Sequence, residues 1–309
     1  MISQKLDISP SHYVSVHTPS KACQGYILYI HGGPGGHSAY FERALQDFSA
    51  YQNLPYGWIC FDQRNCGRSP QSDIVPVTHQ QNKDDIVDLI DALQKMGYPL
   101  LAVMGHSYGG RLAYELCIEK TTNMKNYILL GRAEDSQLSF RRSVYIDLLL
   151  LKIFEPEKYQ SLWPQLTQCE TPDLTTLKMV RGKMNNVENR KLFYWGNLEA
   201  LRWFDAIKEE IGLSDNNEVY DQVVASFLPA DKQENMDINK LTGNILWVNG
   251  WHDYLMGGDT LFGQAQTNIK IFKGSGHYPQ YEEPELFVRT LLNFISFENE
   301  KNENSLASL

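Results

Sequence analysis

The chain has 309 residues, of which 42% are hydrophobic and 21% are charged. That is enough to build one large α/β domain, or a core domain that carries an insertion. The formal net charge is −9 and no stretch is rich in lysine or arginine, which indicates that nucleic acid is not a partner.

Cysteine usage and the N-terminal sequence bear on the compartment. The five cysteines form an odd number without any C-x-x-C pair, so we expect neither a disulfide framework nor a metal site. Residues 1–11 lack the basic and apolar regions of a signal peptide, and the longest strongly apolar run, Leu148–Leu151, is too short to span a bilayer. We expect a cytoplasmic protein without a membrane partner. The sequence leaves the oligomeric state open.

Near-continuous apolar runs predict strands that are buried on both faces of a parallel sheet. They are Tyr26–Ile30, Trp58–Phe61, Leu100–Met104, Tyr127–Leu130, Ile245–Val248 and Ile269–Phe272. The more alternating stretch His12–His17 predicts an edge strand. A helical pattern over Ile86–Met96 ends at Gly97, just before the next strand. The order strand, helix, strand favours a doubly wound sheet.

A long segment without strand patterns interrupts this order. Residues 132–237 are rich in helix formers and aromatic side chains, with prolines as punctuation. We expect a mainly helical cap there, lying over one edge of a core made of residues 1–131 and 238–297. Residues 298–309 are polar, and we expect a frayed, flexible tail.

A G-x-S-x-G motif, Gly105–Gly109, follows the third of the apolar runs and opens a helical pattern. A serine on such a strand-to-helix turn is exposed as a nucleophile. Its strained backbone is tolerated only beside small residues, which the glycines two positions either side supply. The helix N-terminus stabilises negative charge that develops near the serine. We therefore predict that Ser107 is the nucleophile.

The glycine-rich stretch His31–Gly36 follows the first of the apolar runs. It lacks the G-K-[ST] and G-x-G-x-x-G patterns of phosphate-binding loops. Glycines let backbone N–H groups approach a substrate, and a tetrahedral oxyanion needs two such donors. We assign these donors to Gly33 and Tyr108 and a substrate contact to Gly32. We expect His31 to brace the loop.

An acid and then a histidine are expected after the nucleophile along the chain. Asp253 and His277 each stand just past the carboxyl end of an expected strand, where such sheets build their sites. We predict that His277 takes the serine proton, while Asp253 fixes its tautomer and stabilises the imidazolium. His252 is a rival base, and Asp259 and Glu282 are rival acids.

The motifs His31–Gly36, Asp62–Ser69 and Gly274–His277 together resemble the proline iminopeptidase family of α/β-hydrolases, which carries H-G-G-P-G and D-Q-R-G-x-G-x-S at the first two places. The resemblance covers roughly residues 24–131 and 243–297, but not the cap. It implies the α/β class and the α/β-hydrolase fold, with a mostly parallel central sheet flanked by helices. It also implies a serine peptidase, without a cofactor, that removes an N-terminal residue, commonly proline, from short peptides.

The sequence departs from this family around the nucleophile. The family's turn usually reads G-G-S-W-G-S, whereas Gly105–Gly110 reads G-H-S-Y-G-G, and Asn65 replaces a glycine. These changes bear on the proline preference rather than on hydrolysis. A carboxylesterase, lactonase or amidase acting on a small acyl substrate is therefore the alternative. Because the nucleophile is a serine, acyl transfer is favoured over the carboxylate chemistry of dehalogenases and epoxide hydrolases of this fold.

An aminopeptidase must also hold a protonated amine, for which the family uses glutamates of the cap. The V-E-N stretch around Glu188 is similar to one such site, so Glu188 is the predicted amine ligand, through a charge-assisted hydrogen bond. Glu134 and Glu218 are weaker candidates. Trp195 and Trp203 either line an apolar pocket or belong to the core.

Overall fold

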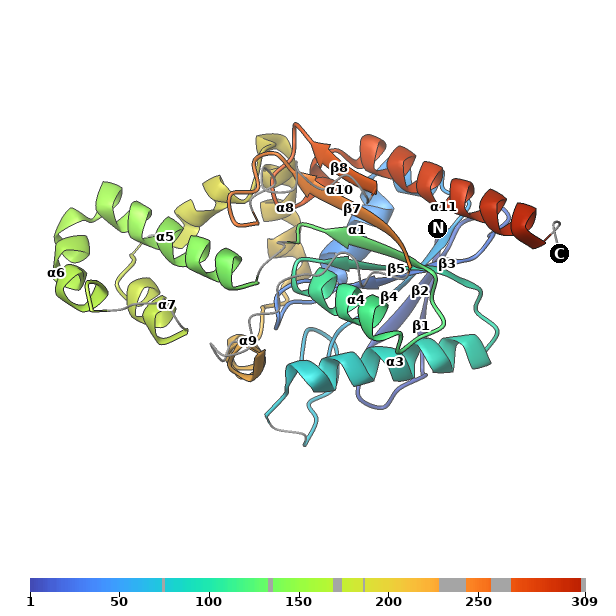
Figure 1. The fold of residues 1–309 in the computed structure, drawn as a ribbon, viewed down its shortest axis with the longest axis horizontal. Helices are drawn as coiled ribbons and strands as arrows, with labels where there is room; N and C mark the ends of the chain where they lie inside the picture. The colour runs from blue at the N-terminus through green and yellow to red at the C-terminus, as the bar shows by residue number, and fades with distance from the viewer. Residues whose placement is uncertain are drawn as a thin grey trace.

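The computed structural model describes residues 1–73, 76–132, 136–168, 174–185, 187–227, 243–256 and 268–306; of residues 136, 137, 187, 188 and 297–306 it describes the backbone alone. A sheet of eight strands crosses this part of the chain in the order β1-β2-β4-β3-β5-β6-β7-β8 (Figure 1). The strands are β1 (Ile2–Leu6), β2 (Val14–Thr18), β3 (Tyr26–Ile30), β4 (Gly57–Phe61), β5 (Leu100–His106), β6 (Asn126–Leu130), β7 (Asn244–Gly250) and β8 (Asn268–Phe272). From β4 to β8 neighbouring strands are parallel, whereas β2 is antiparallel to both of its neighbours.

All of the apolar runs that predicted strands are strands, but the expected edge strand is wrong. The segment His12–His17 overlaps β2, which lies between β1 and β4 and buries Val14 and Val16. The edge is β1, most of whose residues are exposed. A strand with little buried surface carries no apolar run, so its sequence gives no strand signal.

Helices cover both faces of the sheet, as Figure 1 shows. One face carries α3 (His79–Lys95) and α4 (Tyr108–Glu119), and the other carries α1 (Ala39–Asp47), α2 (Ser49–Gln52), α10 (Pro279–Glu282) and α11 (Pro284–Leu306). Successive side chains of a strand point to opposite faces. Thus Leu28 and Ile30 join the core under α3 and α4, and Ile27 and Tyr29 join the other core. Burial on both faces explains the continuous apolar runs.

The ends of α3 follow from local sequence. The side chain of Thr78 accepts a hydrogen bond from the N–H of Gln81 at 3.1 Å, as an N-cap residue does. Gly97, with a φ of +84°, ends the helix as predicted, and the N–H of Tyr98 donates to the backbone oxygen of Leu93 at 3.0 Å.

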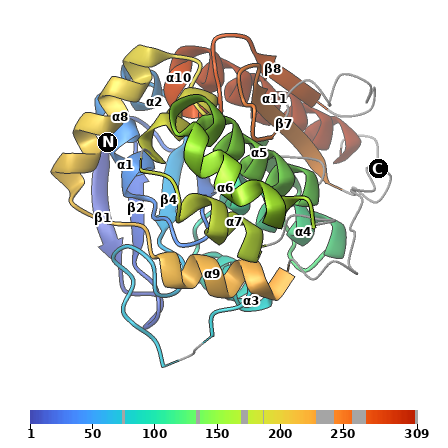
Figure 2. The ribbon, with the colours of Figure 1, turned by 90° about the vertical axis from the view of Figure 1, so that its left-hand side faces the viewer.

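The described chain between β6 and β7 is helical. Its helices are α5 (Ser136–Phe154), α6 (Pro156–Leu166), α7 (Leu174–Arg181), the 3-10 helix η1 (Val187–Phe193), α8 (Leu198–Ile211) and α9 (Asn217–Phe227). In Figure 1, α5, α6 and α7 project from the body of the molecule, and in Figure 2 they lie nearest the viewer. They share a small hydrophobic core. In contrast, α8 packs on α1 and α10, and α9 packs on α3. The helical content is as predicted, and the cap boundaries stay a prediction.

The C-terminal helix includes most of the expected tail. α11 continues through Leu306, so the backbone of 298–306 is helical where its polar sequence led us to expect fraying. None of the helices in the described ranges is long and apolar enough to cross a membrane.

Candidate active site

Ser107 lies at the turn between β5 and α4, with φ 54° and ψ −114°, a conformation that side-chain-bearing residues rarely adopt. Two glycines permit this turn. A Cβ atom on Gly105 would meet the backbone oxygen of Gly109 at 2.1 Å, and one on Gly109 would meet the backbone oxygen of Ile30 at 2.2 Å. Glycine is therefore required at both positions because the backbone approaches too closely for a side chain, as the motif predicted.

Tyr108 is the first residue of α4, so its N–H has no acceptor within the helix. The first helical hydrogen bond runs instead from the N–H of Arg111 to the backbone oxygen of Ser107, at 3.1 Å. The Tyr108 side chain is buried, and its hydroxyl lies 3.0 Å from both His79 Nδ1 and Asn82 Nδ2. These contacts hold the first turn of α4, and with it the direction of the Tyr108 N–H.

The glycine-rich loop after β3 reaches the nucleophile because β3 and β5 are neighbouring strands. A Cβ atom on Gly32 would lie 3.1 Å from the Cβ of Ser107, so Gly32 allows the loop to approach the turn closely. Gly33 has a φ of +120°, which favours glycine, and it forms part of the wall of a cavity that Ser107 also lines.

His31 braces this loop, as predicted. Its Nε2 accepts the N–H of Gln63 at 3.0 Å, and its backbone oxygen accepts from Gln63 Nε2 at 2.9 Å. Burial lowers the pKa of His31 to about 4, so the ring is neutral and Nε2 is available as an acceptor.

Asn65 stands where the resembled family has glycine, and its conformation explains why asparagine suffices. Its φ is 59°, in the left-handed region that asparagine tolerates better than most residues. Its Oδ1 accepts the N–H of Ser72 at 2.7 Å, and its backbone oxygen accepts from Asn216 Nδ2 at 2.9 Å. Asparagine is therefore compatible with the left-handed conformation at this position.

The carboxyl ends of β7 and β8 bring Asp253 and His277 together. His277 Nδ1 lies 2.8 Å from Asp253 Oδ2, and the residues are 4% and 1% exposed, respectively. Asp253 Oδ1 accepts the N–H of Met256 at 3.0 Å, and the N–H of His277 donates to the backbone oxygen of Tyr194 at 2.5 Å. A carboxylate on Nδ1 keeps the proton there and leaves Nε2 able to accept one.

Ser107 and His277 line one cavity of about 600 Å³, together with Gly33 and Tyr108. This volume is in the range of small-molecule sites. The predicted nucleophile, base and oxyanion donors thus surround a single space, and Asp253 backs the imidazole of His277.

Glu282, a rival for the role of the acid, has a different environment. Its two buried oxygens accept the N–H groups of Gly196 and Asn197, before α8, and of Gly276 and Tyr278, on either side of the base, at 2.6 to 3.1 Å. Burial raises the pKa of Glu282 despite these four donors. The carboxylate therefore joins the inserted helices to the loop that carries the histidine.

The role of Glu188 as the amine ligand stays a prediction. The side chain of Glu188 lies outside the described residues, although its backbone belongs to η1, and Glu134 and Asp259 lie outside them too. Glu218 is described: it is an exposed residue of α9 whose Oε1 accepts from Gln222 Nε2 at 3.1 Å.

The polar character of the cavity wall was missed by sequence reasoning. Its described part contains six basic side chains, Arg111, Arg132, Arg181, Arg190, Lys191 and Lys208, and one carboxylate, Asp215. These residues come from several helices and loops and share no sequence spacing, so no pattern could have indicated them. Trp195 lines the same cavity and is also part of the core, whereas Trp203 packs beside that core.

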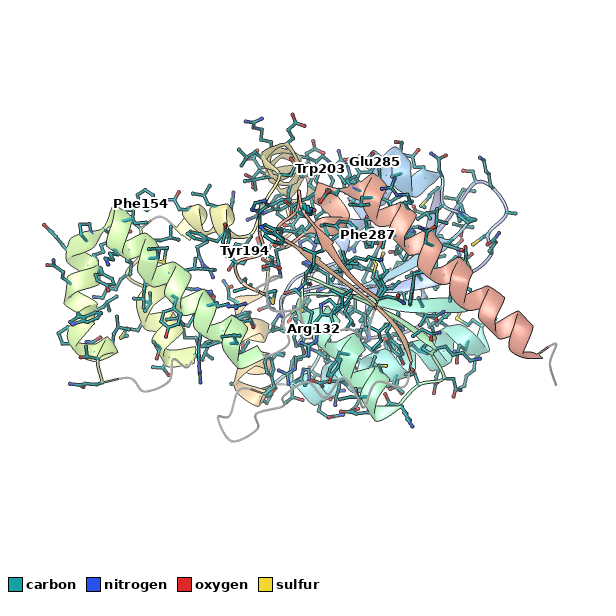
Figure 3. All side chains as sticks on the ribbon, turned by 45° about the horizontal axis from the view of Figure 1, so that its top comes forward. Arg132, Phe154, Tyr194, Trp203, Glu285 and Phe287 are labelled. Carbon is teal, nitrogen blue, oxygen red and sulfur yellow. The ribbon has the colours of Figure 1, made fainter. Side chains whose placement is uncertain are left out.

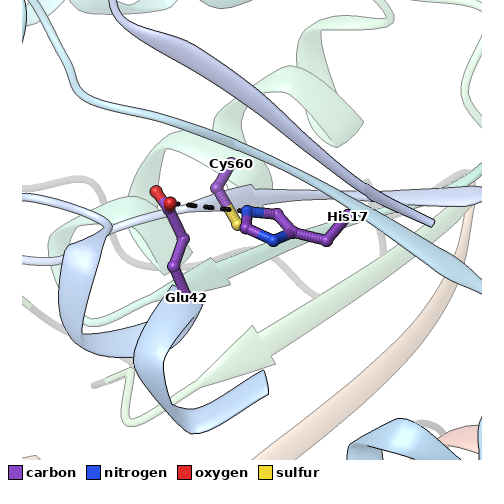
Figure 4. A group of neighbouring side chains, drawn as sticks. All are labelled: His17, Glu42 and Cys60. Atoms are coloured by element: carbon purple, nitrogen blue, oxygen red, sulfur yellow. Dashed lines mark ion pairs between the residues drawn. The ribbon is translucent and has the colours of Figure 1, made fainter. Parts of the chain in front are cut away.

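One group of side chains within the described residues has donor atoms close enough for a metal ion: His17, Glu42 and Cys60 (Figure 4). The group does not fit a metal site. Glu42 is held by the Arg68 guanidinium and by Ser38 Oγ, and burial raises the pKa of the Cys60 thiol well above its usual value. A neutral thiol is a poor ligand. Glu42 instead pairs with Arg68, beside the His17 ring and the neutral Cys60 thiol.

The model of the alpha/beta hydrolase family matches residues 27–290. The chain belongs to this family. It is accordingly a hydrolase with the α/β-hydrolase fold, which confirms the fold class expected from the motifs.

This hydrolase is also similar to curated proteins of different names. It is 23% identical to epoxide hydrolase 1 of Caenorhabditis elegans over 296 residues, which cover 92% of the chain and 67% of the worm protein. It is 33% identical to a putative proline iminopeptidase of Mycoplasma genitalium over 116 residues, covering 37% of the chain and 35% of that protein. The matched part of the hydrolase thus spans only about a third of the mycoplasma protein.

Solved structures with the same fold cover nearly all of the hydrolase. A proline iminopeptidase-related protein of Thermus thermophilus matches 96% of the chain and 98% of its own, with a TM-score of 0.68 and 17% identity. The proline iminopeptidase of Mycobacterium smegmatis matches 97% and 100%, with a TM-score of 0.64 and 18% identity. At these identities the likeness establishes the fold.

Proposed function

We propose that this hydrolase cleaves an ester or amide bond of a small acyl substrate through an acyl-enzyme, with Ser107, His277 and Asp253 as its catalytic residues. The observation that carries the proposal is the 2.8 Å contact of Asp253 with His277, a residue that lines the same cavity as Ser107. Each of the three follows the carboxyl end of a different parallel strand, which is where this kind of sheet builds its sites.

The proposed reaction has two acyl-transfer steps. His277 Nε2 takes the proton of Ser107 as its Oγ attacks the substrate carbonyl, and Asp253 stabilises the imidazolium that forms. The N–H groups of Gly33 and Tyr108 donate to the oxyanion. His277 returns the proton to the leaving group, and a water molecule that His277 activates then hydrolyses the acyl-enzyme.

The serine nucleophile favours acyl transfer over the epoxide hydrolysis named for the worm relative. An epoxide hydrolase of this fold attacks through a carboxylate, whereas Ser107 occupies the turn here. A serine with a histidine base favours acyl transfer.

A proline-type aminopeptidase is the second candidate. It is supported by the similarity to the putative proline iminopeptidase of Mycoplasma genitalium and by Asp215, a carboxylate in the cavity wall that is able to pair with a protonated amine. The excess of basic side chains in the described wall opposes it, because an uncompensated positive charge repels a cationic group. Arg111 and Lys191 each pair with a carboxylate of their own, whereas Arg181 and Arg190 share one. We therefore place the acyl esterase or amidase first.

A fluorophosphonate probe and a substrate panel test both candidates. We expect the probe to label the wild-type protein and the Ser139→Ala variant, in which another serine of the cavity wall is removed, but not Ser107→Ala. We expect short acyl esters to be hydrolysed and aminoacyl arylamides with a free amine to be poor substrates. Labelling of Ser107→Ala would contradict the proposal, and turnover of the free-amine substrates alone would establish the aminopeptidase.

A further inference from the structure

Two arginines in the cavity wall share one buried carboxylate. Asp147 of α5 has no exposed surface; its Oδ2 lies 2.8 Å from Nε of Arg181, and its Oδ1 lies 2.5 Å from Nε of Arg190. Both arginines also donate to Ser143 Oγ, each at 2.8 Å. Two guanidinium groups therefore face one carboxylate, and the cluster carries an excess positive charge.

The arginines keep donor capacity for a further partner. Their contacts within the described residues use the Nε and Nη2 nitrogens of Arg181 and Arg190. Among the described residues, each Nη1 therefore keeps its hydrogens available to donate. Both side chains line the cavity, and they are only 28% and 14% exposed, so a charge placed there interacts in partly desolvated surroundings.

One aromatic ring separates this cluster from the proposed base. Arg190 Nη2 donates to the hydroxyl of Tyr194 at 2.5 Å, and the guanidinium carbon lies 5.3 Å from the centre of that ring. The Tyr194 ring lies 5.9 Å from the ring of His277. Figure 3 shows Tyr194 where the projecting helices meet the body of the molecule. A small substrate at Ser107 therefore has the arginines within its reach.

We propose that Arg181 and Arg190 bind a carboxylate of the substrate, so that the hydrolase prefers esters or amides whose acyl or leaving group carries one. The planar guanidinium donates two parallel hydrogen bonds to a carboxylate. The proposal rests on the proposed function for the position of the bond that is cleaved. The carboxylate site adds the chemical class of the substrate to that function. It also gives a role to the positive charge of the two arginines that Asp147 does not neutralise.

Paired esters test this preference. For the acyl side, mono(p-nitrophenyl) adipate is compared with p-nitrophenyl methyl adipate, which has the same length without the charge. For the leaving-group side, acetoxybenzoate is compared with its methyl ester. We expect kcat/KM to be about 10-fold or more higher for the charged member of at least one pair, in line with a charge-assisted hydrogen bond. The pair that shows the preference identifies the part of the substrate that carries the carboxylate.

Single variants connect the preference to the cluster. Arg190→Gln and Arg181→Gln each leave Asp147 with one guanidinium partner, so its charge stays compensated. We expect either variant to reduce the charged-to-neutral ratio of kcat/KM about 10-fold, and Arg190→Lys to restore part of it. Arg202→Gln, which removes the same charge from an exposed position of α8, is the matched control and should keep the wild-type ratio.

Binding without turnover separates this inference from the proposed function. We expect adipate, but not its dimethyl ester, to raise the melting temperature of Ser107→Ala, and to fail to do so when Arg190→Gln is added. If no ester is hydrolysed but adipate binds in this way, the proposed function fails and the carboxylate site stands. If neutral esters are hydrolysed equally well and adipate has no effect, the arginines only brace α5, α7 and η1, and the inference is overturned.

Discussion

The ring of His106 donates a hydrogen bond from Nε2 to the backbone oxygen of His277, at 2.8 Å. A carbonyl oxygen accepts only, so the proton of this imidazole is on Nε2. Burial, with the neighbouring His277, lowers the pKa of His106 to about 3, which keeps the ring neutral. The residue before the nucleophile thus holds the loop that carries the proposed base.

Loss of this link should slow turnover. We expect His106→Leu to lower kcat about 10-fold, because His277 is less well held, and to lower the free energy of unfolding by about 1–3 kcal/mol, because the carbonyl oxygen of His277 loses its donor. Steady-state kinetics and urea unfolding measure the two effects. An unchanged kcat in a stably folded variant would show that the bond does not position the base.

Two adjacent glycines should respond differently to alanine. A Cβ on Gly109 would meet a backbone oxygen at 2.2 Å, whereas the nearest contact for Gly110 is 3.2 Å. We expect Gly109→Ala to abolish activity and lower the melting temperature sharply. Gly110→Ala should be nearly neutral, because higher helix propensity offsets the tighter contact. Circular dichroism melts and ester hydrolysis of both variants provide the comparison, and equal effects would contradict this geometry.

Glu282 should be needed as an ionised acceptor. The Glu282→Gln side chain has one acceptor oxygen, so two of the four backbone N–H groups lose their acceptor. We expect a loss of about 2–4 kcal/mol in the free energy of unfolding and weaker ester hydrolysis, because two buried donors are left unpaired and the base loop loosens. Glu285→Gln, an exposed change three residues away, should leave both measurements unchanged. Comparable losses in the two variants would rule out a specific role for Glu282.

Acid should destabilise the fold through Glu42. Burial opposes ionisation of Glu42, but hydrogen bonds and charges from His17 and Arg68 outweigh it and lower the pKa to about 2, below the usual 4.5. The ionised group therefore stabilises the fold above about pH 4.5, and this contribution is lost as the pH falls towards 2. It amounts to about 3 kcal/mol.

The variant Glu42→Gln tests this pH dependence. We expect lower stability at pH 7 and a shallower loss of stability between pH 4.5 and 2 than in the wild-type protein. Urea unfolding over a pH series measures both, with the exposed Glu218→Gln as the control. A wild-type slope in Glu42→Gln would assign the acid sensitivity to other carboxylates.

The parts of the site that were predictable from sequence are those attached to sheet strands. Strands buried on both faces have continuous apolar sequences, so their ends, and hence the positions of Ser107, Asp253 and His277, could be located. The exposed strand β1 was missed because it has no such run. Glu282 appeared as a rival acid because sequence spacing does not show which backbone N–H groups surround a side chain.

The arginine cluster could not be predicted from sequence for a different reason. Asp147, Arg181 and Arg190 come from three separate helical segments and meet only because α5, α7 and η1 pack on one another. Contacts between separate helical segments leave no periodic pattern in the sequence. The residues of these helices that contact the substrate are therefore not predictable from the sequence alone.

The carboxylate of Glu282 also links two segments that are far apart in the chain. It accepts hydrogen bonds from the backbone at Gly196 and Asn197 and from the loop of the proposed base, whereas α5, α6 and α7 come before this link in the chain. A recombinant chimera that exchanges these three helices with those of a relative should therefore place its second crossover before Gly196. The recipient protein then keeps its own hydrogen bonds between Glu282 and this backbone.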